Sequence, residues 1–187
     1  MLIIRSEIMN LSKVEERKKY ILRSASELLA EKGLTDITID EVAKQACLSK
    51  GGVTHYFKNK DQLLVELANM LDADYLDRIE EEATKHEATK GVWTRALLDV
   101  ADLDLLGETE ITNALVAGAM ASQKEGNDAK SFEVIQSKLV SDGYDPVLAT
   151  IIRLAIDGLY YAELFKAEPL DPKLRKDVFD RMISWTE

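Results

Sequence analysis

The stretch from Thr38 to Lys60 constrains the fold most, because it predicts two short helices joined by a tight turn. Thr38 is followed three residues later by Glu41, which is the capping-box pattern that opens a helix. Residues 47–49 interrupt this helix, and the Ser49 side chain can cap the next one by accepting a backbone N–H. We expect the apolar residues at helical spacing to face inward: Val42, Ala43, Ala46, Val53 and Phe57.

Two features of this stretch are hard to explain by folding alone. Gly51 and Gly52 lie in the first turn of the second helix, where each costs about 1 kcal/mol relative to alanine. The pair makes sense if the backbone must closely approach something, such as the wall of a DNA groove. Lys60 follows the expected cap Asn59 at the start of the next helix, where the helix dipole disfavours a cation. A docked phosphate would reverse that penalty, and the alternative is an ordinary solvated lysine.

The charge distribution supports a nucleic-acid-binding segment near the N-terminus. The chain has 187 residues and a formal net charge of −10, which by itself argues against nucleic acid. Residues 1–60 nevertheless hold eleven Lys and Arg against eight Asp and Glu, a net charge of +3, whereas the remainder holds thirteen against twenty-six, a net charge of −13. The basic surplus therefore coincides with the predicted pair of short helices, as DNA binding requires.

These residues also carry a family resemblance. A first helix that ends at Gly33, followed by Thr-Ile-Asp-Glu-Val-Ala, Ser-Lys-Gly and Tyr-Phe-Lys-Asn-Lys-Asp-Gln-Leu, resembles the DNA-binding domain of TetR-type (tetracycline-repressor-type) transcriptional regulators. The resemblance covers the first third of the chain. It departs at Thr54 and His55, where many relatives have an aromatic residue, so it indicates the class and not the operator sequence. The residues expected at DNA are Thr38, Ser49, Lys50, Gly51, Gly52, Thr54, His55, Tyr56 and Lys60.

The composition and periodicity of the whole chain predict an all-α fold. Residues 1–12 have no clear period and are expected to form a loose arm. Helices are expected at about 14–32, 60–85, 91–106, 109–125 and 128–142, and two more begin at Asp145-Pro146 and Asp171-Pro172, where an N-cap precedes a first-position proline. We therefore expect an N-terminal three-helix helix-turn-helix domain over 1–60 and a larger helical ligand-binding and dimerisation domain over 61–187.

The segment that follows Pro146 is apolar around nearly its whole circumference, so it must be buried on all sides. In a domain this small, a second copy of the chain is a natural cover, and we expect a homodimer through the last two helices. Arg153 and Asp157 lie four residues apart in this segment, where an ion pair that satisfies itself is favoured over a ligand site. The expected interface residues are Ile151, Ala155, Gly158, Leu159, Ala162, Val178 and Met182.

The leading functional hypothesis is a ligand-responsive, homodimeric transcriptional repressor that binds an inverted-repeat operator and is released by a small-molecule inducer. The inducer site is implied by the resemblance alone. The alternative is a constitutive or architectural DNA-binding protein without an inducer. Candidate ligand-lining residues, each of which also fits plain core packing, are Met70, Trp93, Leu97, Met120, Phe132 and Tyr161.

An enzyme is disfavoured, because the chain offers two histidines, one cysteine and no phosphate loop or metal-spaced cluster. We expect neither a cofactor nor a metal: His86 fits an exposed polar residue, and Cys47 fits a small buried residue rather than a redox switch. The single cysteine suits a reducing cytoplasm. No apolar run approaches membrane-spanning length, and early charges argue against a signal peptide. Either Met1 or Met9 can be the start.

Overall fold

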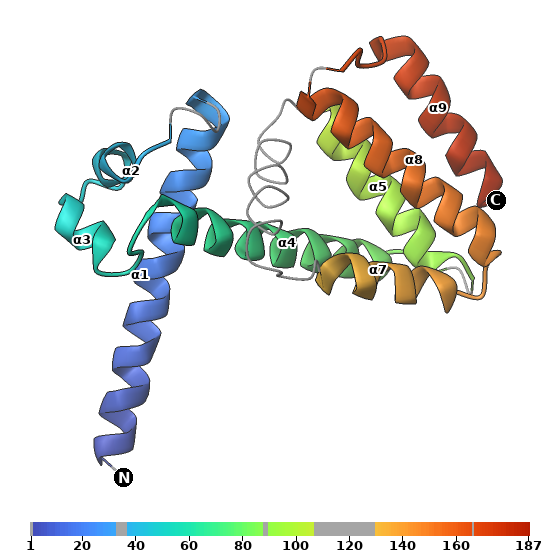
Figure 1. Ribbon diagram of the computed structural model, residues 1–187. Helices are drawn as coiled ribbons and strands as arrows, with labels where there is room; N and C mark the ends of the chain where they lie inside the picture. Colours follow the sequence, from blue (N-terminus) through green and yellow to red (C-terminus); the bar gives the residue numbers. More distant parts are fainter. Residues whose placement is uncertain (1, 33–36, 88–89, 107–129, 166) are drawn as a thin grey trace.

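The computed structural model describes residues 2–32, 37–87, 90–106, 130–165 and 167–187, and every regular element in these ranges is an α-helix (Figure 1). The all-α prediction is confirmed. The expected helix at 109–125, together with Met120, lies outside the described residues. The helices are α1 (Leu2–Lys32), α2 (Ile39–Gln45), α3 (Lys50–Thr54), α4 (Lys60–Ala83), α5 (Val92–Leu106), α7 (Lys130–Val140), α8 (Pro146–Phe165) and α9 (Pro172–Trp185).

The first helix is longer than the periodicity predicted. The expectation of a loose arm over residues 1–12 is wrong, because α1 begins at Leu2 and spans 31 residues. Adding a residue to an existing helix costs far less than nucleating one, so a helix can extend beyond its apolar stripe. Among the α1 side chains whose burial is described, from residue 13 on, the first buried one is Ile21.

The first apolar core, which we call the head, joins α1, α2, α3 and the beginning of α4. The inward direction predicted for Val42, Ala43, Val53 and Phe57 is confirmed, since each is at most 3% exposed. The core also takes leucines from α4, so the apolar packing of the head continues past residue 60. Its buried members are Ile21, Leu22, Ala25, Leu28, Leu29, Ile37, Val42, Ala43, Val53, Phe57, Leu63, Leu64 and Leu67.

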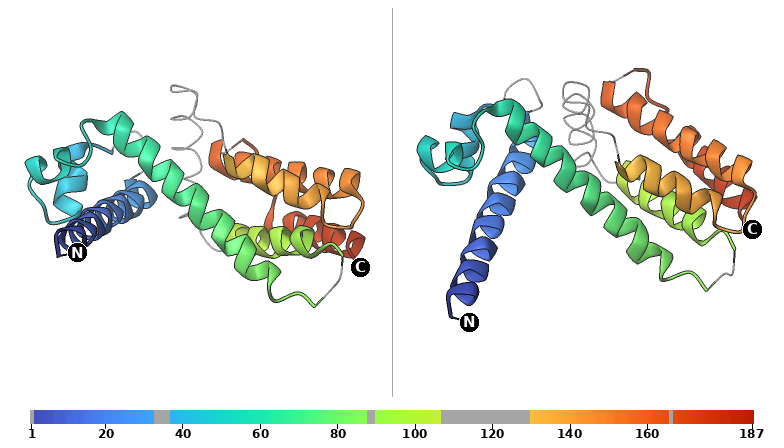
Figure 2. Two further views of the ribbon diagram at one scale, coloured as in Figure 1. Left: turned by 90° about the horizontal axis from the view of Figure 1, so that it is seen from below. Right: turned by 60° about the horizontal axis from the view of Figure 1, so that its bottom comes forward.

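Helix α4 runs from the head into a second apolar core, which we call the body (Figure 2). Its first half contributes Leu63 to Leu67 to the head, whereas Ile79 and Ala83 are buried in the body. An ion pair of 3.2 Å between Lys18 Nζ and Glu66 Oε2 adds a polar tie between α1 and α4. A single continuous helix therefore connects the two cores.

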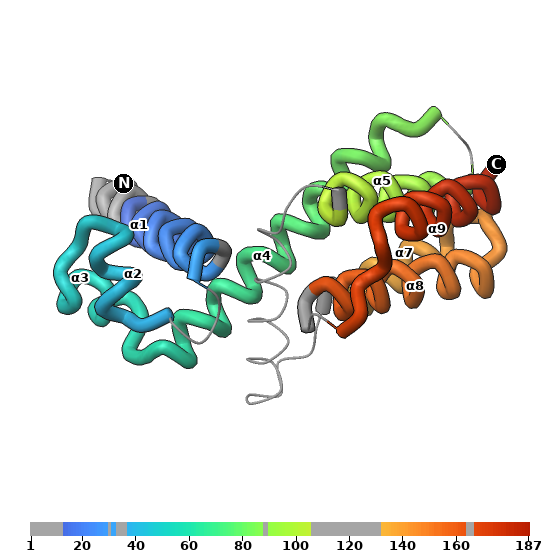
Figure 3. Tube along the Cα trace, turned by 90° about the horizontal axis from the view of Figure 1, so that it is seen from above, coloured from blue at the N-terminus to red at the C-terminus, as the bar shows by residue number. Residues whose placement is uncertain are grey.

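The body is a layered bundle in which α5 and α8 pack together, with α7 and α9 beside them (Figure 3). The predicted starts of α8 and α9 are confirmed by their caps. Asp145 Oδ1 accepts a hydrogen bond from the N–H of Val147 at 2.9 Å, and Asp171 Oδ1 accepts one from the N–H of Lys173 at 3.0 Å. Among the described helices, α4 alone contributes buried residues to both apolar cores.

Candidate DNA-binding surface and helical body

Two side-chain caps set the beginnings of α2 and α3. Thr38 Oγ1 accepts from the Glu41 N–H at 3.1 Å, and Ser49 Oγ accepts from the Gly52 N–H at 3.0 Å. The Glu41 carboxylate does not complete the box, because it accepts hydrogen bonds from Lys32 at 2.6 Å and Lys44 at 2.5 Å. These bonds, led by that from Lys32, lower the pKa of Glu41 to about 2. The acid therefore ties α2 to the end of α1.

The turn between α2 and α3 is closed by a residue in the left-handed region. Cys47 has a φ of 52° and is exposed, so the expectation that it is buried is wrong. The Cys47 N–H donates to Lys44 O at 3.0 Å, and the Leu48 N–H donates to Ala43 O at 2.8 Å. This is the Schellman arrangement, in which the residue after the helix turns the chain away from the axis. The turn places α3 across α2 with its outer face open.

The outer face of α3 presents the residues that the sequence singled out. Lys50, Gly51 and His55 are exposed, whereas Thr54 and Tyr56 are half-buried. Tyr56 packs partly against the head core, and its ring meets the His55 ring edge-on at 5.0 Å between centroids. Tyr56 therefore has a packing role beside any contact with DNA.

The chain's own packing does not require the glycine pair. A Cβ added to Gly51 would meet only Ser49 Oγ, at 3.9 Å, and one added to Gly52 would lie 3.4 Å from the same atom and 3.6 Å from Leu48 Cβ. These are ordinary van der Waals separations. Alanine at either position would fit and would favour the helix by about 1 kcal/mol. A reason for glycine therefore has to come from outside the head, which supports close approach of another molecule.

An acidic residue that the sequence analysis did not single out contacts α3. Asp40 Oδ2 lies 2.9 Å from Lys50 Nζ, and both side chains are more than half exposed. The two residues are ten positions apart on different helices. Their contact depends on the angle at which α3 crosses α2, and periodicity carries no signal for that angle.

The start of α4 is capped reciprocally. Asn59 Oδ1 accepts from the Gln62 N–H at 2.8 Å, and Gln62 Oε1 accepts from the Lys58 N–H, also at 2.8 Å. Lys60 is the first residue of the helix. The predicted cap and the position of Lys60 at the positive end of the dipole are confirmed.

A polar cluster joins α4 to the body. The Arg78 guanidinium donates to both carboxylate oxygens of Asp104, at 3.2 and 2.5 Å, and the Tyr160 hydroxyl donates to Asp104 Oδ2 at 2.9 Å. The Tyr75 ring meets the Tyr160 ring edge-on. Burial raises the pKa of both tyrosines, so they stay protonated as donors. The Asp104 carboxylate thus receives hydrogen bonds from α4 and α8 together.

The described ligand candidates lie in different parts of the structure. Met70 packs against the head core, Leu97 is 2% exposed in the body core, and Tyr161 is 47% exposed. Trp93 is half-buried under Lys138, whose Nζ lies 4.4 Å from the ring centroid. Each position depends on how its helix is rotated about its own axis. Residue spacing within one helix does not predict how separate helices are rotated relative to one another.

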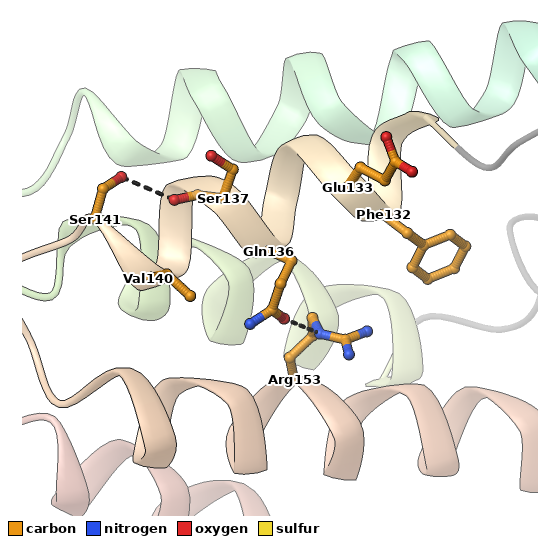
Figure 4. A pocket seen from close by; sticks show the side chains of 7 residues that line it. All are labelled: Phe132, Glu133, Gln136, Ser137, Val140, Ser141 and Arg153. Atoms are coloured by element: carbon orange, nitrogen blue, oxygen red, sulfur yellow. Dashed lines mark hydrogen bonds between the residues drawn. The ribbon is translucent and has the colours of Figure 1, made fainter.

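Phe132 lines an open groove of about 670 Å³ beside α7 and α8. Gln136 and Arg153 meet across it, with the Arg153 Nε donating to Gln136 Oε1 at 2.7 Å (Figure 4). Arg153 also donates to Asp157 at 2.6 Å, which confirms the predicted self-satisfying pair. The full lining is Phe132, Glu133, Gln136, Ser137, Val140, Ser141 and Arg153.

One face of α8 is apolar and uncovered. Val147, Ile151, Leu154 and Tyr161 are between 47% and 66% exposed. They recur at threes and fours and share a face with the exposed Gly158. Ala155, Leu159, Ala162 and Val178 are half-buried, and all of these except Ala162 pack against the body core. Met182 faces the wrong way for an interface, because it is 2% exposed and packs in the body core.

His86 is not the exposed residue that the sequence analysis expected. Its side chain is 23% exposed, and its Nε2 lies 2.9 Å from Asp99 Oδ2. Glu82 completes a group of three potential metal ligands within 4.8 Å of one another. Asp99 comes from α5, so this grouping required the packing of α5 on α4 to be known.

Two family models match the chain. The model for bacterial regulatory proteins of the tetR family matches residues 21–67, which contain α2, α3 and their caps. The model for the tetracyclin repressor-like C-terminal domain matches residues 91–187, more than half of the chain. The chain belongs to the TetR family. It is therefore a helix-turn-helix transcriptional regulator of a non-enzymatic family, as the motif predicted.

Known proteins resemble this TetR-family chain in sequence or in fold. The fatty acid metabolism regulator protein of Bacillus subtilis (strain 168) is 35% identical over 77 residues, which cover 40% of this chain and 39% of that relative. A transcriptional regulator from Rhodococcus sp. Rha1 has a TM-score of 0.74 at 21% identity, covering 89% and 94% of the two chains. The multidrug binding protein EbrR complexed with malachite green has a TM-score of 0.62 at 21% identity, covering 89% and 98%.

Among the described helices, none is long and apolar enough to span a membrane.

Proposed function

We propose that this TetR-family chain is a homodimeric, cytoplasmic repressor that binds an inverted-repeat operator and is released by a small-molecule inducer. The observation that carries the proposal is the division of α4 between two cores. One end of α4 packs under the DNA-facing helices, and the other end is buried in the body. A change in the body therefore has a rigid route to the head.

DNA contact is assigned to the outer face of α3 and to the start of α4. Lys50, Thr54 and His55 are offered to base edges, because the N-terminal part of a recognition helix meets the major groove. Gly51 and Gly52 let the backbone come close, and Thr38, Ser49, Tyr56 and Lys60 are assigned to the neighbouring phosphates. The net charge of +3 over residues 1–60 supports this side of the molecule.

The second copy of the chain is assigned to the uncovered face of α8, with α9 beside it. Ile151, Leu154 and Tyr161 expose apolar area that a partner would remove from water, at about 25 cal/mol per Å². A two-fold dimer presents two copies of α3, so the operator is expected to be an inverted repeat with half-sites about 34–36 Å apart.

The inducer is assigned to the body. EbrR, a structural neighbour, is a multidrug binding protein solved with malachite green and with imidazole, which supports a small-molecule role for this architecture. The groove beside Phe132 is the described recess that such a ligand can enter. The second candidate function, a constitutive DNA-binding protein, applies if the body takes no ligand.

Selection of bound duplexes from a random pool, followed by sedimentation of the complex, tests the operator and the dimer together. The expected result is an enriched inverted repeat with two chains bound per site. Thermal-shift screening against a metabolite library then tests induction. A compound that raises the melting temperature and also weakens operator binding supports the repressor, and enriched DNA without any such compound supports the constitutive binder.

A further inference from the structure

Three side chains with metal-ligating atoms meet where the C-terminal end of α4 reaches α5. Glu82 lies in the last turn of α4, His86 follows four residues later, and Asp99 faces them from α5. We propose that Glu82, His86 and Asp99 bind one divalent transition-metal ion of the zinc class, which clamps the end of α4 to α5.

The geometry is close to that of such a site. Zinc holds imidazole nitrogen and carboxylate oxygen at about 2.0–2.2 Å, which places neighbouring tetrahedral ligand atoms about 3.4 Å apart. His86 Nε2 and Asp99 Oδ2 lie 2.9 Å apart, and all three ligand atoms lie within 4.8 Å of one another. Closing a separation of 4.8 Å to about 3.4 Å needs a shift of about 1.4 Å by the Glu82 carboxylate, which would complete the three-ligand set and leave a fourth position for water.

The charges at this end of α4 independently favour a cation. Glu80, Glu81 and Glu82 stand at the negative end of the helix dipole, where carboxylates are disfavoured, and the last turn of α4 holds no basic residue. Lys85 Nζ pairs with Glu82 Oε2 at 2.7 Å, but its side chain is 57% exposed. An exposed lysine can swing into water when an ion takes its place. One imidazole with two carboxylates is a borderline donor set that suits zinc better than magnesium.

The ion would act on the segment that joins the head to the body. Glu82 belongs to the helix shared by both cores, whereas Asp99 belongs to α5 inside the body. Bridging them adds a bond between α4 and α5 near the end of α4, beyond the Arg78–Asp104 ion pair that already joins the two helices. The bound ion therefore stabilises the folded chain by mass action, because the unfolded chain does not hold the three ligands together.

Calorimetric titration of the tag-free, chelator-treated full chain with zinc chloride tests this site without any DNA. The titrations use a Cys47→Ser background, which removes the single thiol as a competing ligand. We expect one ion per chain by elemental analysis and a raised melting temperature. His86→Ala should weaken zinc binding at least about tenfold, since loss of even a supporting residue around a metal costs that much. Glu82→Gln should weaken it similarly.

Two control variants separate this cluster from casual binding. Glu81→Gln removes the same charge from the neighbouring exposed glutamate, and His55→Gln removes the other histidine; both should bind zinc within twofold of the parent. Equal affinity in the parent, His86→Ala and Glu82→Gln would mean an adventitious ion only and would overturn the proposal, as would no binding at all. If His86→Ala fails to fold, Glu82→Gln decides, because it keeps the size of the side chain and removes its charge.

Discussion

At the scale of single residues, the two lysines of the DNA-facing side differ in kind. Lys50 is exposed on α3 beside Asp40, where a DNA base edge is within the reach of a recognition helix. Lys60 begins α4, where we propose that the helix amides and the ammonium group bind a phosphate together. The proposed contact of Lys50 depends on the DNA sequence, and that of Lys60 does not.

Lys60→Ala should therefore weaken binding to every duplex and reduce the slope of log affinity against log salt by about one unit. Lys50→Ala should cost about 1–3 kcal/mol on the operator and relax specificity there. Titrations of both variants on operator and random duplexes at several salt concentrations separate the two effects. Unchanged affinity and slope for Lys60→Ala would show that the phosphate assignment is wrong.

Asp40→Asn should raise affinity for random duplex several-fold and lower the ratio of operator to random affinity. The carboxylate neutralises Lys50 at 2.9 Å and repels phosphates, so it selects against contacts that lack a matching base. Asp77→Asn, which makes the same charge change at an exposed position of α4, is the matched control. An unchanged ratio in the Asp40 variant would reduce the pair to a surface contact.

Glu41 gives a pH dependence whose sign follows from its pKa, which is lowered from 4.5 to about 2 in the folded chain. The folded state holds the ionised form, so the stability that Glu41 contributes is present above about pH 4.5 and is lost as the pH falls toward 2. Glu41→Gln should therefore lower the melting temperature near neutral pH, and the difference from the parent should shrink on acidification. Glu80→Gln, at an exposed position of α4, should show no such convergence.

At the scale of elements, α8 has one apolar face that is buried and another that is exposed. Ala149, Ile152 and Ile156 are buried against the body, whereas Ile151, Leu154 and the neighbouring Gly158 face outward. A helix whose buried stripe is already filled has no use within the chain for a second apolar stripe. The second stripe is what the proposed dimer covers.

Gly158→Trp should convert the dimer into a folded monomer with greatly weakened operator binding. Gly158 is exposed, and a Cβ placed there meets nothing within 4 Å, so a side chain at this position points away from the chain's own packing. A closely packed partner has no room for the indole, because overpacking an interface forces the surfaces apart. Sedimentation measures the result, with Glu80→Trp as the control at an exposed site on α4. A Gly158→Trp chain that sediments as an intact dimer would remove this face from the interface.

At the scale of the whole molecule, we propose that α4 transmits movement from the body to the head. Its 24 residues extend about 36 Å at 1.5 Å per residue, so a tilt of a few degrees at the body moves the head by a few ångströms. The polar cluster of Arg78, Asp104 and Tyr160 lies where α4 packs against α5 and α8. Met70, one of the candidate ligand-lining residues, packs against the head core. A bulkier side chain there would therefore disturb the head.

Inducer affinity should fall when saturating operator is present, by the same factor by which inducer lowers operator affinity. The reciprocity follows from linkage, and a coupling of about 1–3 kcal/mol corresponds to roughly 5- to 150-fold. Titrating a compound found by thermal shift with and without operator measures it. Equal affinities would remove the induced-repressor mechanism and leave the constitutive DNA-binding protein.

The sequence by itself determined the features that depend on neighbouring residues. The caps at Thr38, Ser49, Asn59 and Asp171 were readable because a cap and its partner lie within three residues. The family motif and the inward faces of α2 and α3 were readable for the same reason, since helical periodicity relates residues one turn apart. The family models then confirmed the class that this local pattern predicted.

The tertiary structure alone decided which helices meet and at what angle. It paired Asp40 with Lys50, brought Asp99 to His86 and Glu82, and turned Met182 inward although its spacing fitted an outer stripe. The extension of α1 to Leu2 was also invisible to periodicity, because helix propagation needs no apolar stripe. Contacts between distant residues depend on helix crossing angles and rotational phases, which are set by the packing of whole cores and leave no mark on a single helix.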